Sequence, residues 1–142
     1  MANSTGSVEI IEKTEQLLKD YQTSRKARLE KNGLKNVYCK ILSVLSQRDG
    51  DTQLDLVQRS GLQAPTVSIT LRGMEREGLV KRVSDENDLR KSHVFITENG
   101  RSRAQEAENA SKEFGKLILD GISDEEIEVF LNVLKKIEKN MK

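Results

Sequence analysis

The amino-acid sequence predicts a mainly α-helical protein that carries one small β-hairpin near the middle of the chain. Apolar residues recur at steps of three and four through most of the 142 residues, which is the spacing of amphipathic helices. The alternation of apolar and polar residues that is typical of strands is limited to short segments on either side of the polar stretch 84–91. The length suits one ordinary domain, because most domains contain roughly 100 to 150 residues.

Composition and charge narrow the possible functions. The 24 Lys and Arg residues nearly balance the 23 Asp and Glu residues, so the net charge of +1 gives no support to unspecific coating of nucleic acids. The longest apolar run has three residues, and we therefore expect no membrane span or signal peptide, but a soluble protein of the cytoplasm. One Cys and one His are too few for a disulfide or a Cys/His zinc site, so we expect no metal and no cofactor. No catalytic motif, phosphate-binding loop or dinucleotide fingerprint is present, which argues against an enzyme.

The first third of the chain is predicted to hold a tail and two helices. Residues 1–7 are small and polar and predict a disordered tail. Residues 8–32 carry a narrow apolar stripe among charges, which indicates a long helix that ends near Gly33. Apolar residues then recur at three-residue and four-residue steps over 34–45, so a core helix should follow and close near Gly50.

Two short helices should come next. Thr52 followed by Asp55 resembles a capping box, and it begins a helix that Gly61 ends. Pro65 suits the first turn of the second helix, because proline lacks the N–H group that would be unpaired there. This second helix should run as far as Gly78, which acts as its C-cap.

A β-hairpin and two further helices complete the chain. Residues 79–83 should be extended, the polar stretch must turn, and residues 93–97 should return as a strand with Val94 and Ile96 on one face. A long helix should follow as far as Gly121, and a capping box at Ser123 opens the last helix. The first and last helices both have apolar faces that little else in the chain is left to cover, which favours a homodimer.

The middle segment has the order of a winged helix-turn-helix, in which two short helices joined by a Gly-containing turn precede a hairpin with a polar tip. At about 100° per residue, Val67, Leu71 and their neighbours at helical spacing face the core. The opposite face is polar and basic, and a major groove about 12 Å wide admits such a helix. We predict that this face reads DNA through Gln63, Ala64, Thr66, Ser68, Ile69, Arg72 and Arg76. The wing is predicted to contribute Arg82, Asp88, Arg90 and Lys91, with Asp88 orienting an arginine for the minor groove.

The residues around the hairpin follow a specific spacing. They read Met74-Glu75-x-x-Gly78-Leu79-Val80-x-Arg82, then Asp88-x-Arg90, Val94-x-Ile96-Thr97 and Gly100. In this pattern the chain resembles the MarR (multiple antibiotic resistance regulator) family of bacterial transcription factors over roughly residues 8–142. The resemblance implies a repressor that binds double-stranded DNA at a near-palindromic operator, with half-site centres about 10 base pairs apart. It also implies a homodimer with interlocked terminal helices, and a small-molecule or redox signal that loosens DNA binding.

The resemblance divides the chain into four parts. These are a disordered tail at 1–7, a dimerisation helix at 8–32, a winged DNA-binding domain at 33–98 and two dimerisation helices at 99–142. It further implies an effector pocket between the dimer region and the reading domain. Tyr21, Tyr38 and Phe114 are candidates to line that pocket, although aromatic residues at helical spacing more often belong to a core.

Two other functions stay open at this point. The near-neutral charge would suit a winged module that binds another protein and not DNA. Cys39 would serve as the thiol of a hydroperoxide sensor, but its place beside core positions favours a packed and inert thiol. His93 is expected to be a strand-surface residue and not a metal ligand. Gly73 either permits a close approach or is merely tolerated, at a cost of about 1 kcal/mol against Ala.

Overall fold

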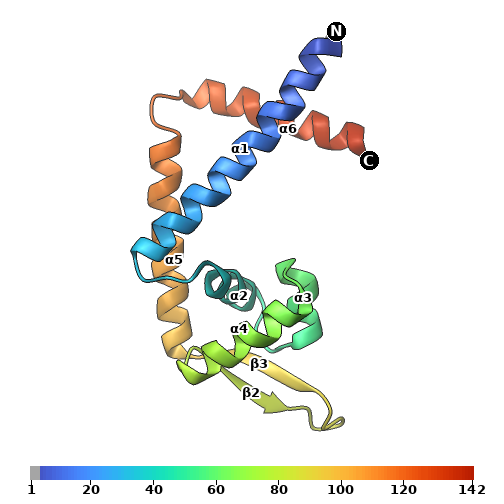
Figure 1. The fold of residues 1–142 in the computed structure, drawn as a ribbon, viewed down its shortest axis with the longest axis vertical. Coiled ribbons are helices and arrows are strands. Elements are labelled where there is room, and N and C mark those ends of the chain that lie inside the picture. The colour runs from blue at the N-terminus through green and yellow to red at the C-terminus, as the bar shows by residue number, and fades with distance from the viewer. Residues whose placement is uncertain (1–3) are drawn as a thin grey trace. The chain divides into compact units, whose positions relative to one another are not determined.

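The computed structural model describes residues 4–142, which form six α-helices and a three-stranded antiparallel sheet (Figure 1). Residues 1–3, part of the predicted tail, lie outside the described residues. The chain divides into two compact units, one ending at Ser111 and one comprising Lys112–Lys142. The elements are α1 (Ser4–Lys31), α2 (Asn36–Gln47), β1 (Asp51–Thr52), α3 (Gln53–Ser60), α4 (Ala64–Arg76), β2 (Val80–Ser84), β3 (Ser92–Ile96), α5 (Glu98–Ile118) and α6 (Asp124–Met141). The predicted fold class, mainly α with a hairpin wing, is confirmed.

Two features of the fold differ from the prediction. Helix α1 begins at Ser4, so the prediction of a disordered tail is wrong for residues 4–7. Adding a residue to an existing helix gains one hydrogen bond per residue ordered, so a helix extends into small polar residues that lack an apolar pattern. Strand β1 is absent from the prediction, because two residues are too few to show alternation. It pairs Asp51 with Val94 and thereby makes β3 the central strand of the sheet.

The predicted helix ends are confirmed by their hydrogen bonds. At the start of α3, the backbone N–H of Asp55 donates to Thr52 Oγ1 at 3.2 Å, and the N–H of Thr52 donates to Asp55 Oδ2 at 3.0 Å. The backbone hydrogen bond from Thr52, followed by the one from its side chain, lowers the pKa of the Asp55 carboxyl group. Ser123 and Glu126 form the same reciprocal box at the start of α6. Gly78, at φ 72°, turns the chain from α4 into β2.

The main core lies between α2, α3, α4 and the sheet. Its buried members are Ile41, Leu42, Leu45, Leu56, Val67, Leu71, Met74, Leu79, Val80, Val94 and Ile96. Val67, Leu71 and Met74 are 0% exposed, which confirms the predicted inner stripe of α4. Burial of a large apolar side chain contributes about 1.5 to 3 kcal/mol, so this stripe holds α4 firmly on the domain. A smaller cluster joins α1, α2 and α5 through Leu29, Leu34, Cys39 and Ala107.

A buried carboxylate fastens β1 to the helices on either side of it. The side chain of Asp51 is 2% exposed and accepts a hydrogen bond from Arg48 Nε at 3.1 Å. Its other oxygen, Oδ2, contacts Arg59 Nη1. Arg59 also donates to the carbonyl oxygens of Val44 at 2.9 Å and of Arg48 at 3.2 Å. One ion-pair cluster therefore connects α2, β1 and α3.

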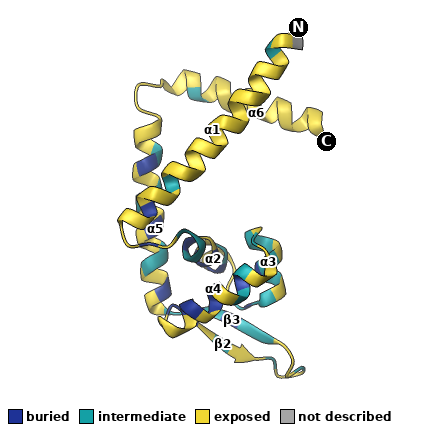
Figure 2. Ribbon diagram, in the orientation of Figure 1, coloured by how far each residue is buried: buried dark blue, intermediate teal, exposed yellow. Residues whose placement is uncertain are grey.

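Helices α1 and α6 leave much of their surface open in the single chain (Figure 2). The exposed large apolar residues of α1 are Val8, Ile10, Ile11, Leu17, Leu18 and Tyr21. Those of α6 are Val129, Phe130, Leu131, Val133, Leu134, Ile137 and Met141. Large apolar patches rimmed by polar residues mark interaction surfaces. None of the described helices combines the length and the apolar character that crossing a membrane requires.

Candidate nucleic-acid interface

Helix α4 turns its polar face to solvent because its inner stripe is held in the core. Pro65 stands in its first turn, as predicted, and Gln63 is its N-cap residue. Among the predicted reading residues, five are exposed, namely Gln63, Ala64, Ile69, Arg72 and Arg76. Thr66 and Ser68 are half-buried. Ile69, Arg72 and Arg76 together line a shallow groove along the helix with Glu75.

The centre of this face combines a guanidinium with an apolar side chain. Arg72 has one long contact within the domain, from Nη2 to Ser68 Oγ at 3.5 Å. The side chain of Ile69 is apolar, and yet the residue is 67% exposed. A free guanidinium can pair with both acceptors of a guanine, and a branched apolar side chain can pack against the methyl group of a thymine. The α4 face therefore carries both types of group that distinguish bases in a major groove.

The wing presents a guanidinium that its own loop orients. Strands β2 and β3 pair from Val80 with Ile96 to Ser84 with Ser92. Beyond them, Asp88 Oδ1 accepts hydrogen bonds from the backbone N–H and from Nε of Arg90, both at 3.1 Å. The side-chain hydrogen bond from Arg90, followed by the backbone one, lowers the pKa of Asp88. Arg90 and the neighbouring Lys91 are exposed, the Arg90 side chain by 91%, so the guanidinium group that Asp88 holds is open to solvent.

Arg82 lies apart from the other predicted wing residues. Its side chain is 25% exposed, and its Nε is 3.3 Å from Glu75 Oε2. Its Nη1 donates to Gln53 Oε1 at 3.3 Å. The grouping of Arg82 with the wing contacts is therefore corrected, because its guanidinium is engaged within the domain. Since Arg82 pairs across the sheet with the buried Val94, near the root of the hairpin, it connects β2 with α3 and α4.

His93 lies half-buried at the root of the wing. Its Nδ1 is 2.8 Å from the carbonyl oxygen of Gly50, and its Nε2 is 2.7 Å from Asp85 Oδ2. His93 lies in strand β3 as expected, and pairing of β1 with β3 brings Gly50 beside its ring. Within the described part of the chain, no group of three or more His, Cys, Asp or Glu side chains is placed to hold a metal ion.

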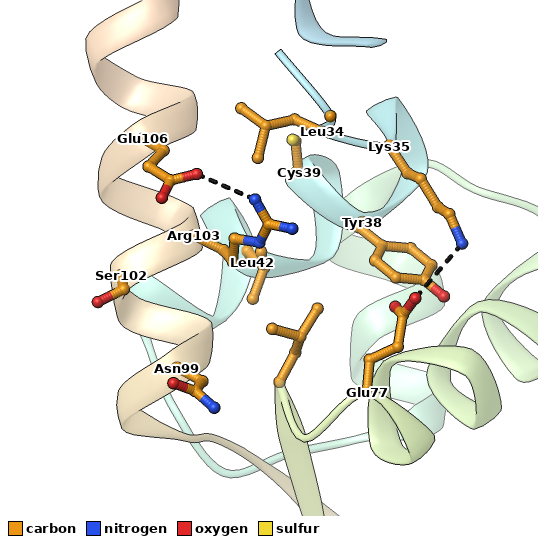
Figure 3. A pocket seen from close by; sticks show the side chains of 12 residues that line it. Leu34, Lys35, Tyr38, Cys39, Leu42, Glu77, Asn99, Ser102, Arg103 and Glu106 are labelled. Atoms are coloured by element: carbon orange, nitrogen blue, oxygen red, sulfur yellow. Dashed lines mark hydrogen bonds and ion pairs between the residues drawn. The ribbon is translucent and has the colours of Figure 1, made fainter.

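A cavity of about 410 Å³ lies between α2, α5 and the end of α4 (Figure 3). It is lined by Gly33, Leu34, Lys35, Tyr38, Cys39, Leu42, Glu77, Leu79, Asn99, Ser102, Arg103 and Glu106. Its charged residues form two ion pairs, Lys35 with Glu77 at 3.6 Å and Arg103 with Glu106 at 3.1 Å. The Lys35 ammonium group also lies 4.7 Å from the centre of the Tyr38 ring. An apolar wall faced by solvent-exposed ion pairs can accommodate a small molecule with a ring and a polar group.

The three aromatic residues predicted to line an effector pocket do not meet there. Tyr38 lines the cavity, whereas Tyr21 lines a separate hollow with Arg25 and Lys40. Phe114, which belongs to the unit Lys112–Lys142, is buried and is not among the lining residues. Of the three residues, Tyr38 alone therefore lines this cavity. The sequence does not indicate the ion pair of Lys35 with Glu77, because the two residues come from distant segments that only the fold brings together. The three-residue spacing of Arg103 and Glu106 was the one local signal.

Tyr38, which lines the cavity, also lies against Gly73 of α4. A Cβ atom at Gly73 would lie 2.3 Å from Tyr38 Oη, far inside van der Waals distance. This decides between the two interpretations of Gly73, because the glycine admits a close approach, here of a tyrosine side chain. Tyr38 therefore touches the cavity on one side and the backbone of α4 on the other.

Cys39 is packed and not poised for reaction. Its side chain belongs to a buried cluster and the residue is 3% exposed. Burial raises the pKa of the thiol, and the charges of Arg25 and Arg103 oppose this only in part. Since the thiolate is the reactive species, these surroundings do not favour the hydroperoxide-sensing alternative.

The comparisons with known proteins agree with this geometry. A model of the MarR family matches residues 32–91. A MarR-like transcription regulator from Bacillus cereus ATCC 10987 is 18% identical, with a TM-score of 0.86 over 98% of this chain and 100% of that chain. A mutant of S. aureus MepR bound to an oligodeoxyribonucleotide is 25% identical, with a TM-score of 0.61 over 91% and 95%. BpsR of Bordetella bronchiseptica, whose DNA binding is regulated by 6-hydroxynicotinic acid, is 18% identical, with a TM-score of 0.72 over 89% and 98%.

The matches cover the parts of the chain that build the candidate interface. The family model extends from just after α1 into the wing loop, and so includes α2, α3, α4 and β2. The similar structures extend over nearly all of the remaining helices as well. Residues 32–91 therefore match the MarR family of transcriptional regulators, and the described chain has the fold of the similar structures.

Proposed function

We propose that this protein is a DNA-binding transcriptional regulator that acts as a homodimer and represses transcription until a small molecule binds. The observation that carries the proposal is the exposed, basic face of α4, which is backed by a fully buried stripe and accompanied by the oriented Arg90. A helix held in this way keeps its shape when it enters a groove. The oligodeoxyribonucleotide bound to the MepR mutant supports the same use of the fold.

Each part of the interface has its own role in the proposed complex. Arg72, near the middle of α4, pairs with a guanine in the major groove. Arg76 and Lys91 contact phosphates, and Gln63, Ala64, Thr66, Ser68 and Ile69 contact base edges or the backbone around the start of the helix. Arg90 enters a minor groove, whose negative potential attracts a guanidinium. Phosphate contacts set the register on the duplex, and base contacts supply the sequence preference.

The proposed dimer explains the uncovered apolar residues of α1 and α6. Each of these helices exposes six or more large apolar residues in the single chain. A homodimer with twofold symmetry would cover such faces and present two copies of α4 to one side of a duplex. The proposed operator is accordingly a near-palindrome, with half-site centres about 10 base pairs apart.

Two arginine variants test the proposed DNA contacts. Arg72→Ala is expected to lower discrimination at one or two base pairs by about 1 to 3 kcal/mol each, because a bidentate contact is lost. Arg90→Ala is expected to weaken binding to all sequences and to reduce the slope of log Kd against log salt, because a charge is removed from the duplex surface. Fluorescence anisotropy on duplexes selected from a random pool measures both the base discrimination and the salt slope.

The control for these variants is Lys116→Ala, which removes one positive charge from an exposed position of α5 outside the interface. It should leave both the base preference and the salt slope close to those of the wild type. Unchanged affinity of both arginine variants across the salt series would contradict the assignment of the interface. A monomer in light scattering at micromolar concentration, or one chain per duplex, would contradict the dimer.

The cavity beside α4 is the proposed site of the regulating molecule. A ligand there competes with Tyr38 for space, and Tyr38 touches α4 at Gly73. The pair Lys35–Glu77 adds a second connection, because Glu77 caps the end of α4. The regulation of BpsR by 6-hydroxynicotinic acid supports a small aromatic acid as the first compound to test.

Filling the cavity should abolish this response. Ser102 lines the cavity from an exposed position on α5, so Ser102→Trp should occupy the space without disturbing the core. For the wild type, a bound compound at 100 times its Kd should raise the free energy of unfolding by about 2.7 kcal/mol and weaken operator binding. Ser102→Trp should show neither effect, whereas Glu113→Trp on the exposed face of the same helix should show both. Thermal melting and fluorescence anisotropy measure both responses. Equal responses of the two variants would show that the ligand binds elsewhere.

A further inference from the structure

The ring of His93 is held between two acceptors that carry no proton of their own. Nδ1 faces the carbonyl oxygen of Gly50 at 2.8 Å, and Nε2 faces the carboxylate oxygen Oδ2 of Asp85 at 2.7 Å. A neutral imidazole has a single N–H group and can donate to one of these oxygens only. The imidazolium ion has two N–H groups and donates to both. The geometry at the root of the wing therefore fits the protonated ring.

Asp85 transmits this contact into the loop of the wing. Its second oxygen, Oδ1, accepts hydrogen bonds from the backbone N–H groups of Asn87 at 2.8 Å and of Asp88 at 3.0 Å. The backbone N–H of Asp85 donates to the carbonyl oxygen of Lys91 at 3.0 Å, which closes the loop. Asp88 in turn holds Arg90 through the two hydrogen bonds described above. A continuous set of hydrogen bonds thus runs from His93 to the guanidinium at the wing tip.

The charges that surround His93 are carboxylates from two elements. Asp85 belongs to the wing, and Asp55 belongs to α3. The charge of Arg48, at the end of α2, acts on Asp55. On the two strands that flank β3, the residues paired with His93 are Thr52 and Val83, which carry no charge. The hydrogen bond to Asp85, followed by the one to Gly50, raises the pKa of His93 above its ordinary value of 6.5. Desolvation opposes this rise, and the charges of Asp85 and Asp55 add to it.

We propose that His93 is a positioning residue for DNA binding, which as an imidazolium ion fastens the wing loop and thereby presents Arg90 to the minor groove. The inference rests on the proposed function, because it needs the wing to meet DNA. The sign follows from the raised pKa of His93. The two hydrogen bonds donated by the imidazolium ion of His93, which hold the wing loop, are fully present below about pH 6.5. They are lost as the pH rises through the raised pKa of His93 in the folded protein. Operator affinity should therefore fall with rising pH.

The wild type provides the first measurement. Operator Kd is measured by anisotropy from about pH 5.5 to 8.5 at constant ionic strength, the range over which a histidine titrates. We expect Kd to rise by about threefold to tenfold, since one unit of pKa difference between the free and the DNA-bound protein corresponds to tenfold in affinity. His93 is the one histidine of the chain, so its proton NMR signal is assigned without a variant. In the free protein, the amide signals of Asn87 and Asp88 should titrate together with the ring.

Three variants separate positioning of the wing from a general effect of charge near DNA. His93→Gln does not titrate and donates from one amide group, so its Kd should be weak and independent of pH. Asp85→Asn keeps an acceptor oxygen but lacks the charge, so it should move the midpoint to lower pH. Arg90→Ala leaves the ring and the phosphates in place, but it should lose most of the pH dependence because His93 acts through the wing tip. Circular dichroism at each pH verifies that every variant is folded.

The outcomes distinguish this inference from the proposed function. A pH-independent Kd of the wild type, or a His93→Gln profile as steep as that of the wild type, would overturn the inference. A full pH dependence that survives in Arg90→Ala would also overturn it, because the ring would then act through its charge alone. Operator binding persists in each of these cases. Absence of binding to any selected duplex at every pH would instead remove the proposed function itself.

Discussion

Asp51→Asn is expected to lower the free energy of unfolding by about 3 to 5 kcal/mol, which is the usual cost of breaking a buried ion pair. The side chain of Asp51 is 2% exposed and receives both Arg48 and Arg59. The amide of Asn would place N–H groups against guanidinium groups and leave the largely buried guanidinium of Arg59 without its charged partner. Because Arg59 keeps the carbonyl oxygens of Val44 and Arg48, the lower end of the range is expected.

Urea unfolding followed by circular dichroism measures this effect. All proteins are compared at one concentration, because dimerisation makes apparent stability depend on concentration. The control is Glu86→Gln, the same change from acid to amide at an exposed position of the wing loop. It should stay within about 0.5 kcal/mol of the wild type. A loss of less than about 1 kcal/mol in Asp51→Asn would show that the cluster does not fasten β1 to its neighbours.

Gly100→Ala is expected to destabilise the protein by about 1 to 3 kcal/mol, although alanine favours a helix by about 1 kcal/mol over glycine. A Cβ atom at Gly100 would lie 2.2 Å from the carbonyl oxygen of Leu79 and 2.7 Å from Ile96 Cγ1. The Leu79 oxygen also accepts the backbone N–H of Thr97 at 3.0 Å, so it cannot withdraw without losing a hydrogen bond. The first turn of α5 is therefore seated against the start of β2 only when residue 100 lacks a side chain.

The same helix offers a matched control for Gly100. Gly115→Ala makes the identical change in α5, but nothing lies within 4 Å of the added Cβ atom. It should raise the free energy of unfolding by up to about 1 kcal/mol, because helix propensity acts there without a clash. Thermal and urea unfolding of both variants give the comparison. Equal effects of the two substitutions would contradict the proposed role of close packing at Gly100.

The helices and their ends were predictable because their causes are local. The inner stripe of α4 follows from residues three and four apart, and the caps at Thr52 and Ser123 depend on a partner three positions away. The exposure of Arg72 follows from the same periodicity, since it lies opposite the centre of the buried stripe. Spacing alone was therefore enough to outline the reading face.

The contacts that the sequence did not reveal all join distant segments. Strand β1 is too short to show a pattern and exists because β3 offers it a partner. Arg82 looked like a wing residue, but Glu75 and Gln53 reach it only after α3, α4 and β2 have packed. Tyr21 and Tyr38 both have helical spacing, and nothing local indicates that only Tyr38 faces the cavity. Spacing constrains neighbours along the chain, and it does not fix which elements meet.

The position of β3 in the middle of the sheet has a mechanical consequence. One side of β3 is hydrogen-bonded to β1 and the other side to β2, while Arg82 connects β2 with helix α4 through Glu75. The hairpin is therefore held at its base on both sides, and we expect helix α4 and the wing to move as one unit. In the proposed dimer, a bound effector would change the distance and the angle between the two winged helix-turn-helix domains, each of which moves as a rigid body. The dimer would then stay bound to its operator only if both domains still fit the roughly 34 Å repeat of the double helix, and it would dissociate if they did not.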